Sequence, residues 1–134
     1  MLVHDLDGNS SNWLLTGNSA HARMLNKSKL HLRARKLLNK IYPTLQVLEE
    51  IPIHVRRSDV LYLDFYIPMI KKCIEVHGEQ HYKFIGHYHG NRLNFLKAKK
   101  RDSEKKDWCE LNNIEHIELR FDQTDEEWQA ILEK

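Results

Sequence analysis

The sequence has almost no cysteine and no long apolar segment. Cys73 and Cys109 are its only cysteines, and they form neither a CxxC motif nor a disulfide framework, so we expect two reduced thiols in the core. No apolar run approaches the roughly 20 residues of a membrane span. The N-terminus also lacks the basic, apolar and small-residue order of a secretory signal. These absences predict a cytoplasmic protein with no membrane partner.

Acidic residues are missing from one long stretch of the chain. Between Gly8 and Leu48 there is no Asp or Glu, and the sign of the charge reverses past Asn113, although the net charge of the whole chain is only +2. The basic residues of the stretch are Arg23, Lys27, Lys29, Arg33, Arg35, Lys36 and Lys40. Such an asymmetry suits a polyanionic partner, whereas the alternative is a solvated helix face that happens to be basic.

Length and composition indicate one globular domain. The 134 residues, of which 30% are charged and 41% hydrophobic, suffice for one core but not for two. Residues 1–19 are rich in Gly, Asn and Ser, so we expect a flexible or loosely docked N-terminal arm. Residues 20–134 would then form the single domain.

Two apolar runs within residues 60–81 each contain one acid at a position that burial alone would not select. Because side chains alternate along a strand, Asp64 lies on the less apolar side of the first run, and Glu75 shares a face with His77 in the second. Pro68 between the runs predicts a strand end and a turn. The resulting hairpin can bring Asp64 beside Glu75.

Two neighbouring carboxylates repel each other, which costs stability unless a cation lies between them. A divalent metal is the simplest explanation. An all-oxygen site suits Mg²⁺ or Mn²⁺, which keep several waters and bridge to phosphate oxygens. His77, two residues past Glu75, could then contact the attacking water or the scissile phosphate. This arrangement is typical of a site that cuts phosphodiester bonds.

Asp64, Glu75 and His77 form the pattern D-x10-E-x-H, and Gly78 and the Gln80-His81 pair follow it. The pattern resembles the PD-(D/E)XK nuclease superfamily, and within it the branch that contains very-short-patch repair endonucleases and the phage EDxHD homing nucleases. The resemblance continues through residues 101–109 and 114–119 and covers roughly residues 28–120. It implies a restriction-endonuclease-like α/β sandwich, in which a mixed sheet of about four strands is flanked by helices.

The resemblance also implies roles for individual residues. Asp64 and Glu75, together with the Val76 carbonyl, would hold Mg²⁺ or Mn²⁺. His77 occupies the place of the lysine that the superfamily usually has. His81 matches the catalytic histidine of the branch and would handle protons.

Asp102 lies in a helical stripe with Phe95 and Cys109, where an apolar residue would be the default. An acid that points inward needs a partner, and the family pattern pairs such an Asp with a histidine, here His81. The alternative is a surface pair between Asp102 and Lys106. Lys106 is also an outlying candidate for the catalytic site.

Residues 28–42 have the spacing of an amphipathic helix, with Ser28 as its N-cap. Nucleases of the branch usually present a glutamate from this helix, and His31 occupies that position here. His31 could serve in its place, Glu49 or Glu50 could reach in from the next element, or the role could be absent.

Basic residues on two predicted helices and one turn are expected to contact the phosphate backbone of DNA. They are Arg33, Arg35, Lys36 and Lys40 in the first helix, Arg56 and Arg57 in a turn over residues 54–59, and Lys97, Lys99, Lys100 and Arg101 in a helix over residues 93–112. Residues 45–53 predict a strand before this turn, which makes a three-stranded meander with the hairpin. Residues 114–119 predict a further strand, and Thr124 caps a last helix.

Residues 78–91 combine His81, His87 and His89 with three glycines. A zinc site is one interpretation, but the segment lacks thiolates and regular spacing. We favour an active-site loop in which His81 is a general base or contacts the phosphate. The aromatic residues of this segment, which are Tyr82, Phe84 and Tyr88, could stack on bases or belong to the core.

Together these patterns predict a metal-dependent DNA endonuclease of a nicking, homing or repair type. A homodimer is one arrangement that would let such an enzyme cut both strands. The first alternative is a nucleic-acid-binding protein that keeps the nuclease fold without turnover. The second is a histidine-rich protein whose zinc is structural.

Overall fold

A five-stranded mixed sheet lies at the centre of the molecule. The structure, a computed structural model, describes residues 1–15, 17–19 and 28–134, so Arg23 and Lys27 of the basic stretch lie outside the described residues. In spatial order the strands are β3 (Asn18–Ser19), β4 (Leu48–Arg56), β5 (Asp59–Ile67), β6 (Lys72–His77) and β7 (Glu115–Arg120). Neighbours from β3 to β6 are antiparallel, and β7 is parallel to β6. The predicted meander of β4, β5 and β6 is confirmed, and β3 adds a fifth strand of two residues.

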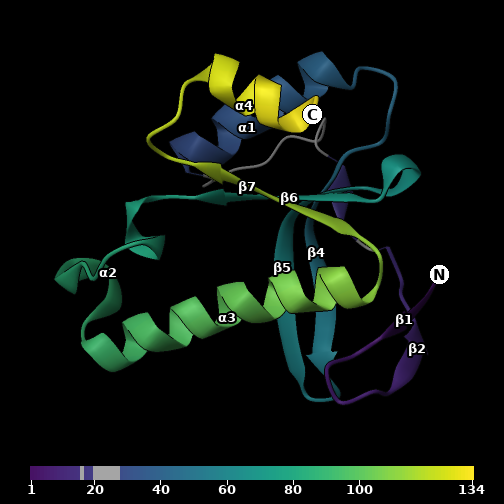
Figure 1. The fold of residues 1–134 in the computed structure, drawn as a ribbon, viewed down its shortest axis with the longest axis vertical. Coiled ribbons are helices and arrows are strands. Elements are labelled where there is room, and N and C mark those ends of the chain that lie inside the picture. The colour runs from purple at the N-terminus through teal and green to yellow at the C-terminus, as the bar shows by residue number, and fades with distance from the viewer. Residues whose placement is uncertain (16, 20–27) are drawn as a thin grey trace.

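Helices cover both faces of this sheet (Figure 1). On one face lie α1 (Lys29–Ile41) and α4 (Asp125–Leu132), and on the other lies α3 (Arg92–Leu111). The short helix α2 (Gly86–His89) precedes α3. None of the helices in the described part of the chain combines the length and the apolarity needed to cross a membrane.

The ends of the helices agree with the sequence signals. The Ser28 hydroxyl accepts a hydrogen bond from the third residue of its helix, and Thr124 forms a capping box with Glu127. Asn113 follows α3 with a φ of 59°, a left-handed conformation that asparagine tolerates. The predicted helices over residues 28–42 and 93–112 are therefore correct to within one residue at each end.

Two apolar cores lie on the two faces of the sheet. Under α1 and α4, Phe65 is fully buried with Trp128. Under α3, Tyr66 is buried with Cys73 and Cys109, and the structure confirms both cysteines as free buried thiols. Because both faces of β5 are covered near these residues, a charged side chain there needs a partner.

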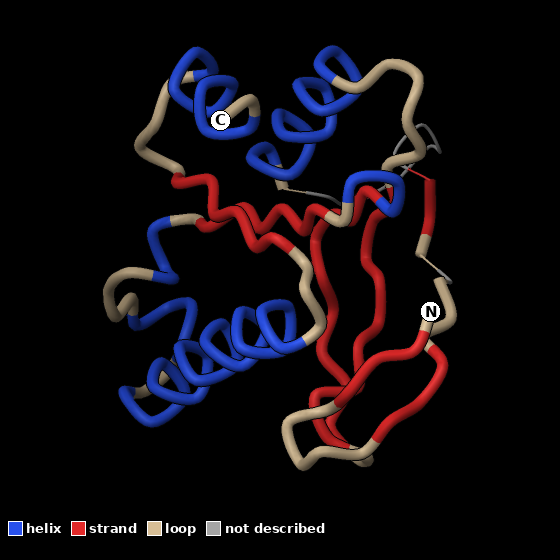
Figure 2. The backbone as a smooth tube through the Cα atoms, turned by 45° about the vertical axis from the view of Figure 1, so that its right-hand side comes forward, coloured by secondary structure: helices blue, strands red, loops and turns tan. Residues whose placement is uncertain are grey.

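β5 and β6 pair over only three residue pairs and then separate. Their register ends with Phe65 opposite Ile74. Beyond that pair, β5 stays with β4 and β6 stays with β7, so the two halves of the sheet point in different directions (Figures 1 and 2). Continuing the register by one residue sets Asp64 opposite Glu75, at the point where the strands part.

β4 extends to Arg56, beyond its predicted end at residue 53, and it contains Pro52. β3 pairs only with Leu48 and Glu49, so the rest of β4 is an edge of the sheet, where a residue without an N–H is tolerated. The Pro52 carbonyl accepts a hydrogen bond from Trp13 Nε1 at 3.0 Å. The turn that follows is consequently shorter than the predicted residues 54–59, since only residues 57 and 58 lie outside the strands.

The first 15 residues pack against the sheet instead of forming the flexible arm that their composition predicts. β1 (Leu2–His4) and β2 (Ser10–Asn12) form an antiparallel hairpin, and the next residue, Trp13, is buried. The ring centroid of Trp13 lies 4.7 Å from that of Tyr66 and 5.1 Å from that of Trp108. The composition misled because one buried indole outweighs many polar loop residues.

Replacing this indole tests whether the hairpin is part of the core. Trp13→Ala should lower the free energy of unfolding by about 3 kcal/mol, because it leaves a cavity among buried aromatic rings. Urea denaturation followed by circular dichroism measures the change. Leu14→Ala is the matched control, since Leu14 is 70% exposed, and it should be nearly neutral. Equal stability of Trp13→Ala and the wild type would show that the hairpin is only loosely docked.

Candidate active site

Asp64 and Glu75 lie side by side where β5 leaves β6, and each carboxylate accepts a backbone hydrogen bond from the other strand. The Asp64 N–H donates to Glu75 Oε2 at 2.9 Å, and the Val76 N–H donates to Asp64 Oδ2 at 2.9 Å. The side chains thus replace the acceptors that continued pairing of the strands would provide. Each carboxylate keeps one oxygen that these two bonds do not use.

Glu75 is almost completely buried, with 1% of its surface exposed. Its Oε1 atom is buried and accepts no hydrogen bond of good geometry, although Lys105 Nζ lies 3.1 Å away. Burial raises the pKa of the Glu75 carboxyl well above its usual range, and the Asp64 carboxylate raises it further, whereas Lys105 acts in the opposite direction. A carboxylate in such surroundings is stabilised by any additional cation.

Lys105, and not Lys106, reaches the acid pair. The ammonium of Lys105 is largely buried beside Glu75, whereas Lys106 is exposed. Burial lowers the pKa of Lys105, but the Glu75 and Asp64 carboxylates raise it by more, so the ammonium is charged at neutral pH. Lys105 was not among the residues predicted from sequence, although its position three residues after Asp102 places both on one side of a helix.

His81 and Asp102 form the predicted pair of a histidine and a carboxylate. His81 Nδ1 lies 2.7 Å from Asp102 Oδ2, and both residues are half-buried. Burial raises the pKa of Asp102, but the hydrogen bond to His81 and its charge lower it by more, so the net shift is downward. The ionised Asp102 therefore orients the imidazole of His81. The structure pairs Asp102 with His81 instead of with Lys106.

The imidazole ring of His77 stacks against that of His81. The two imidazole rings stack with centroids 4.1 Å apart and planes 1° from parallel, and His77 Nδ1 lies 3.2 Å from Glu118 Oε1. Burial lowers the pKa of His77, and the charge of His81 lowers it further, so this ring is neutral at neutral pH. A neutral ring cannot supply the positive charge of a lysine, whereas Lys105 on α3 carries a positive charge beside Glu75.

On the β4 side of Asp64, α1 and β4 contribute a second polar group. His31 Nε2 hydrogen-bonds to the fully buried Glu49, and two nitrogens of Arg35 each lie 3.1 Å from the same Glu49 oxygen. One ligand atom each from His31, Glu50 and Asp64 lie within 4.8 Å of one another. Of the three candidates for the missing helix glutamate, His31 and Glu50 therefore approach Asp64, while Glu49 binds His31 and Arg35.

The histidines and aromatic residues of the loop lie mostly apart from this centre. Within the described residues, the groups of three potential metal ligands are His77 with His81 and Asp102, and His31 with Glu50 and Asp64, so neither group includes His87 or His89. Among the aromatic residues, the Tyr82 hydroxyl donates to Glu118, Phe84 packs against Phe95, and Tyr88 is exposed. Of the three loop histidines, only His81 belongs to such a group in the described part of the chain, so the zinc interpretation gains no ligand from His87 or His89.

The basic residues predicted to contact DNA divide into two sets. The exposed set consists of Lys36, Lys40, Arg57, Lys97, Lys99, Lys100 and Arg101. The internally paired set consists of Arg33, which binds Asp125 and lies over Trp128, Arg35, which binds Glu49, and Arg56, which binds Glu104. Lys97, Lys100 and Arg101 line a pocket of about 390 Å³ beside the tip of the β4–β5 hairpin.

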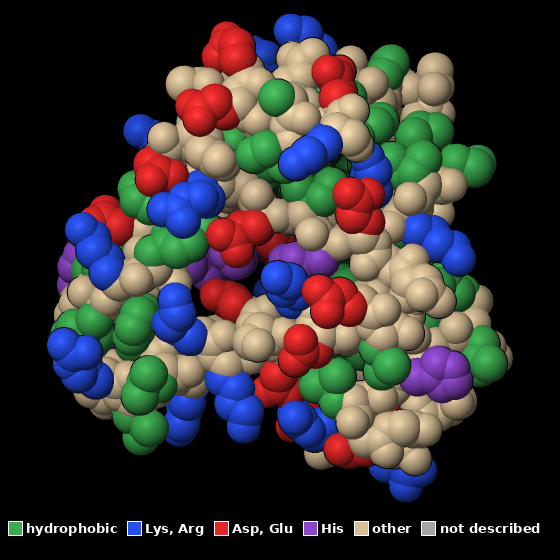
Figure 3. Space-filling model, viewed as in Figure 1, with side chains coloured by type: hydrophobic (Ala, Val, Ile, Leu, Met, Phe, Trp, Pro, Cys, Tyr) green, Lys and Arg blue, Asp and Glu red, His purple; other side chains and the backbone are tan. Residues whose placement is uncertain are grey.

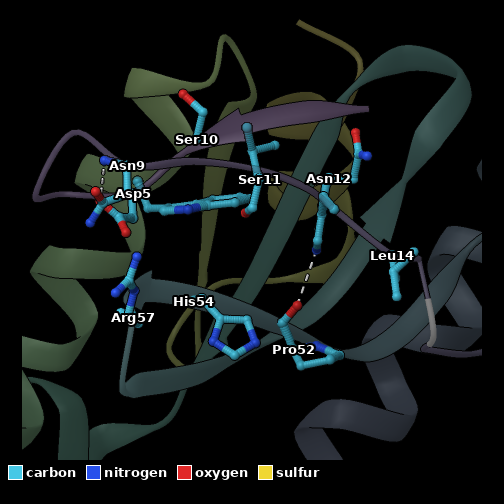
Figure 4. A pocket seen from close by; sticks show the side chains of 12 residues that line it. Asp5, Asn9, Ser10, Ser11, Asn12, Leu14, Pro52, His54 and Arg57 are labelled. Atoms are coloured by element: carbon cyan, nitrogen blue, oxygen red, sulfur yellow. Dashed lines mark hydrogen bonds between the residues drawn. The ribbon is translucent and has the colours of Figure 1, made fainter.

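The surface between α3 and the edge formed by β6 and β7 is hollowed (Figure 3). Acidic and histidine side chains lie along the hollow, and lysine and arginine side chains surround it. A larger pocket of about 450 Å³ lies elsewhere, between the β1–β2 hairpin and β4, where Asp5, Asn9, His54 and Arg57 line it (Figure 4). The lining of that pocket contains neither member of the acid pair.

Comparisons with known proteins relate part of the chain to viral proteins. Over 61 residues it is 41% identical to uncharacterized protein 307L of Invertebrate iridescent virus 6, a match that covers 46% of this chain and 31% of that protein. Over 62 residues it is 36% identical to uncharacterized protein 094L of Frog virus 3 (isolate Goorha), covering 46% of this chain and 40% of that protein. The chain thus matches less than half the length of each relative. No family model and no solved structure matches it.

His116, which lies on β7 opposite Cys73, should make stability depend on pH. Burial lowers its pKa from 6.5 to about 4, and the charge of His77 lowers it further. As the pH falls, the His116 imidazole is therefore protonated in the unfolded chain before it is protonated in the folded chain. The contribution of His116 to stability is complete above pH 6.5 and is lost as the pH falls towards 4. The loss amounts to about 3 kcal/mol.

His116→Gln should remove this part of the pH dependence. Urea denaturation at pH 7.5, 5.5 and 4.5 measures it as the difference between variant and wild type at each pH. His54→Gln replaces an exposed histidine and should follow the wild type. Parallel pH profiles for His116→Gln and the wild type would contradict a neutral buried imidazole.

Proposed function

We propose that this protein is a metal-dependent endonuclease that hydrolyses phosphodiester bonds in DNA and has a restriction-endonuclease-like fold. The observation that carries the proposal is the acid pair of Asp64 and Glu75, with Lys105 Nζ 3.1 Å from Glu75. Metal-dependent cleavage of a phosphodiester uses ligands for a cation, and a fixed positive charge near the phosphate oxygens stabilises the transition state. The acid pair and Lys105 provide both in one buried place.

The acid pair suits Mg²⁺ or Mn²⁺. The ligands would be the Asp64 and Glu75 carboxylates and the Val76 carbonyl, all of them oxygens, which these ions prefer. The burial of Glu75 beside the Asp64 carboxylate favours an added cation at this pair, where Lys105 Nζ already lies 3.1 Å from Glu75 Oε1. When bound, the ion would lower the pKa of a water and neutralise charge on the phosphoryl group.

Lys105, His81 and His77 would each have a separate role in the reaction. Lys105 would stabilise negative charge that develops on the phosphate oxygens. His81, oriented by Asp102, would accept a proton from the attacking water or donate one to the leaving oxygen. His77 would hold the His81 ring in place through the stacked contact.

The exposed basic residues give DNA a path across this face. Lys97, Lys100 and Arg101 lie beside the first residues of β5, and Asp59 is five residues from Asp64 along that strand. At about 3.3 Å per residue this corresponds to about 16 Å, or about five base pairs of duplex DNA. A duplex in the hollow could therefore reach both the acid pair and this basic pocket.

A nucleic-acid-binding protein without turnover is the second candidate. It is favoured by the fact that each acid already accepts a backbone N–H, since both could be kept for the fold alone. The two candidates differ in whether these acids are needed for cleavage.

A plasmid assay distinguishes them. The wild type with Mg²⁺ or Mn²⁺ should nick supercoiled plasmid, and EDTA should abolish nicking. Glu75→Gln should lower the rate to background, because the amide oxygen can still accept the Asp64 N–H but ligates a cation poorly. His81→Gln should lower the rate by roughly 10²–10⁴-fold. Equal nicking by the wild type and Glu75→Gln would point to a contaminant, and no nicking with unchanged DNA affinity would favour the inactive protein.

Lys105 and Lys106 offer a matched comparison within the same assay. Lys105→Ala should lower the nicking rate at least about 10²-fold, because it removes the charge beside Glu75. Lys106→Ala removes the same charge from an exposed position of the same helix and should change the rate less than about twofold. Similar losses in both variants would mean that only general attraction to DNA had changed.

The basic pocket predicts a salt dependence of binding. Replacing Lys97, Lys100 and Arg101 together by Ala should reduce the slope of log K against log salt by about 2 to 3, since each lost phosphate contact removes about 0.9. Fluorescence anisotropy with a labelled duplex measures this slope. A control with Lys29, Lys106 and Lys134 replaced by Ala loses the same charge elsewhere, and an equal reduction there would contradict a localised DNA path.

A further inference from the structure

His31, Glu50 and Asp64 bring three potential metal ligands together on the side of Asp64 that faces away from Glu75 in the sheet order. One donor atom of each residue lies within 4.8 Å of the other two. His31 belongs to α1, Glu50 to β4 and Asp64 to β5, so the group exists only in the folded chain. The roles proposed for the acid pair and Lys105 use neither His31 nor Glu50.

The side chain of His31 is held in position by contacts with the buried residues Phe65 and Glu49. It is 6% exposed, its ring stacks on Phe65 at 4.5 Å between centroids, and its Nε2 hydrogen-bonds to Glu49. Arg35 already balances the charge of Glu49 through two nitrogens at 3.1 Å. The tautomer of His31 that donates Nε2–H to Glu49 keeps the lone pair of Nδ1 for a ligand. Carboxylates orient metal-binding histidines in this way.

Glu50 is presented to the group by an unusual backbone conformation. Its φ of 53° lies in the left-handed region, which is strained for a residue other than glycine. Its neighbours in β4 pair with Phe65 and Leu63, so Glu50 itself lies opposite Asp64. The strained residue is therefore the one whose carboxylate belongs to the group.

We propose that His31, Glu50 and Asp64 form a second divalent-cation site, which selects Mn²⁺ or a similar transition ion over Mg²⁺. One imidazole with two carboxylates suits transition ions, whereas Mg²⁺ prefers oxygen ligands alone. Asp64 would be shared with the acid-pair site, so the catalytic meaning of this second site rests on the proposed function. Its existence can be tested without DNA.

Titration with Mn²⁺ tests the site, because electron paramagnetic resonance measures the free ion. The wild type should bind two Mn²⁺ per chain, and His31→Gln and Glu50→Gln should each bind one. Glu75→Gln should also retain one ion. The electron spin echo modulation of this bound Mn²⁺ should show an imidazole nitrogen, and this nitrogen signal should be lost in the double variant Glu75→Gln/His31→Gln. Excess Mg²⁺ should displace one of the two ions from the wild type. Glu49→Gln should weaken the remaining site of Glu75→Gln by about 10–100-fold.

The controls separate this inference from the proposed nuclease. His54→Gln, an exposed histidine on the same strand as Glu50, should still bind two ions. Glu50→Gln leaves His31 bound to Glu49 and therefore tests the site if His31→Gln folds poorly. A single ion in the wild type, unchanged in Glu50→Gln, would overturn the second site whatever the plasmid assay shows. Two ions in the wild type, one ion in Glu50→Gln and loss of nicking in Glu75→Gln would support both proposals.

Discussion

An antiparallel strand pair that ends in the middle of a sheet leaves backbone N–H groups without acceptors, and a buried N–H without an acceptor is costly. In this protein β5 and β6 end their pairing in that way, and the Asp64 and Val76 N–H groups bond instead to carboxylates of the facing strand. The two acids are therefore needed by the backbone and are forced to lie together. Their mutual repulsion and the burial of Glu75 follow from the same geometry.

α3 provides a positive charge that offsets the repulsion between the Asp64 and Glu75 carboxylates. Its buried side presents Asp102 and Lys105, which are three residues apart, so one turn of helix supplies a cation to the acid pair and an acid to His81. The charges alternate across the hollow, from the carboxylates through Lys105 to Asp102 and His81. Because each ionised group has a neighbour of opposite charge, these groups can stay ionised although they are partly or fully buried.

The features that could be predicted from sequence are those with local causes. The helix from Ser28 and the helix from Thr124 are marked by their caps and apolar spacing, and the alternation within residues 60–81 was enough to place Asp64 beside Glu75. The pair of His81 and Asp102 followed from an acid in an apolar stripe together with a family pattern.

The features that escaped prediction depend on contacts between distant segments. Lys105 was missed because the rotation of α3 against the sheet cannot be read from the helix alone. The left-handed φ of Glu50 and the burial of Trp13 depend on strands more than ten residues away. Pro52 seemed to end its strand because nothing local shows that β4 becomes an edge there.

That edge has a consequence for how copies of the chain behave towards one another. An open strand edge is a template on which another chain can add its own strand. Here Pro52 offers no N–H, Trp13 occupies its carbonyl, and the Leu6 N–H bonds to the Val55 carbonyl at 2.8 Å. Asn112 fastens the hairpin from the far side through two hydrogen bonds to the His4 backbone. The N-terminal hairpin and Trp13 thus occupy hydrogen-bonding groups of the β4 edge to which a strand of another chain could otherwise be added.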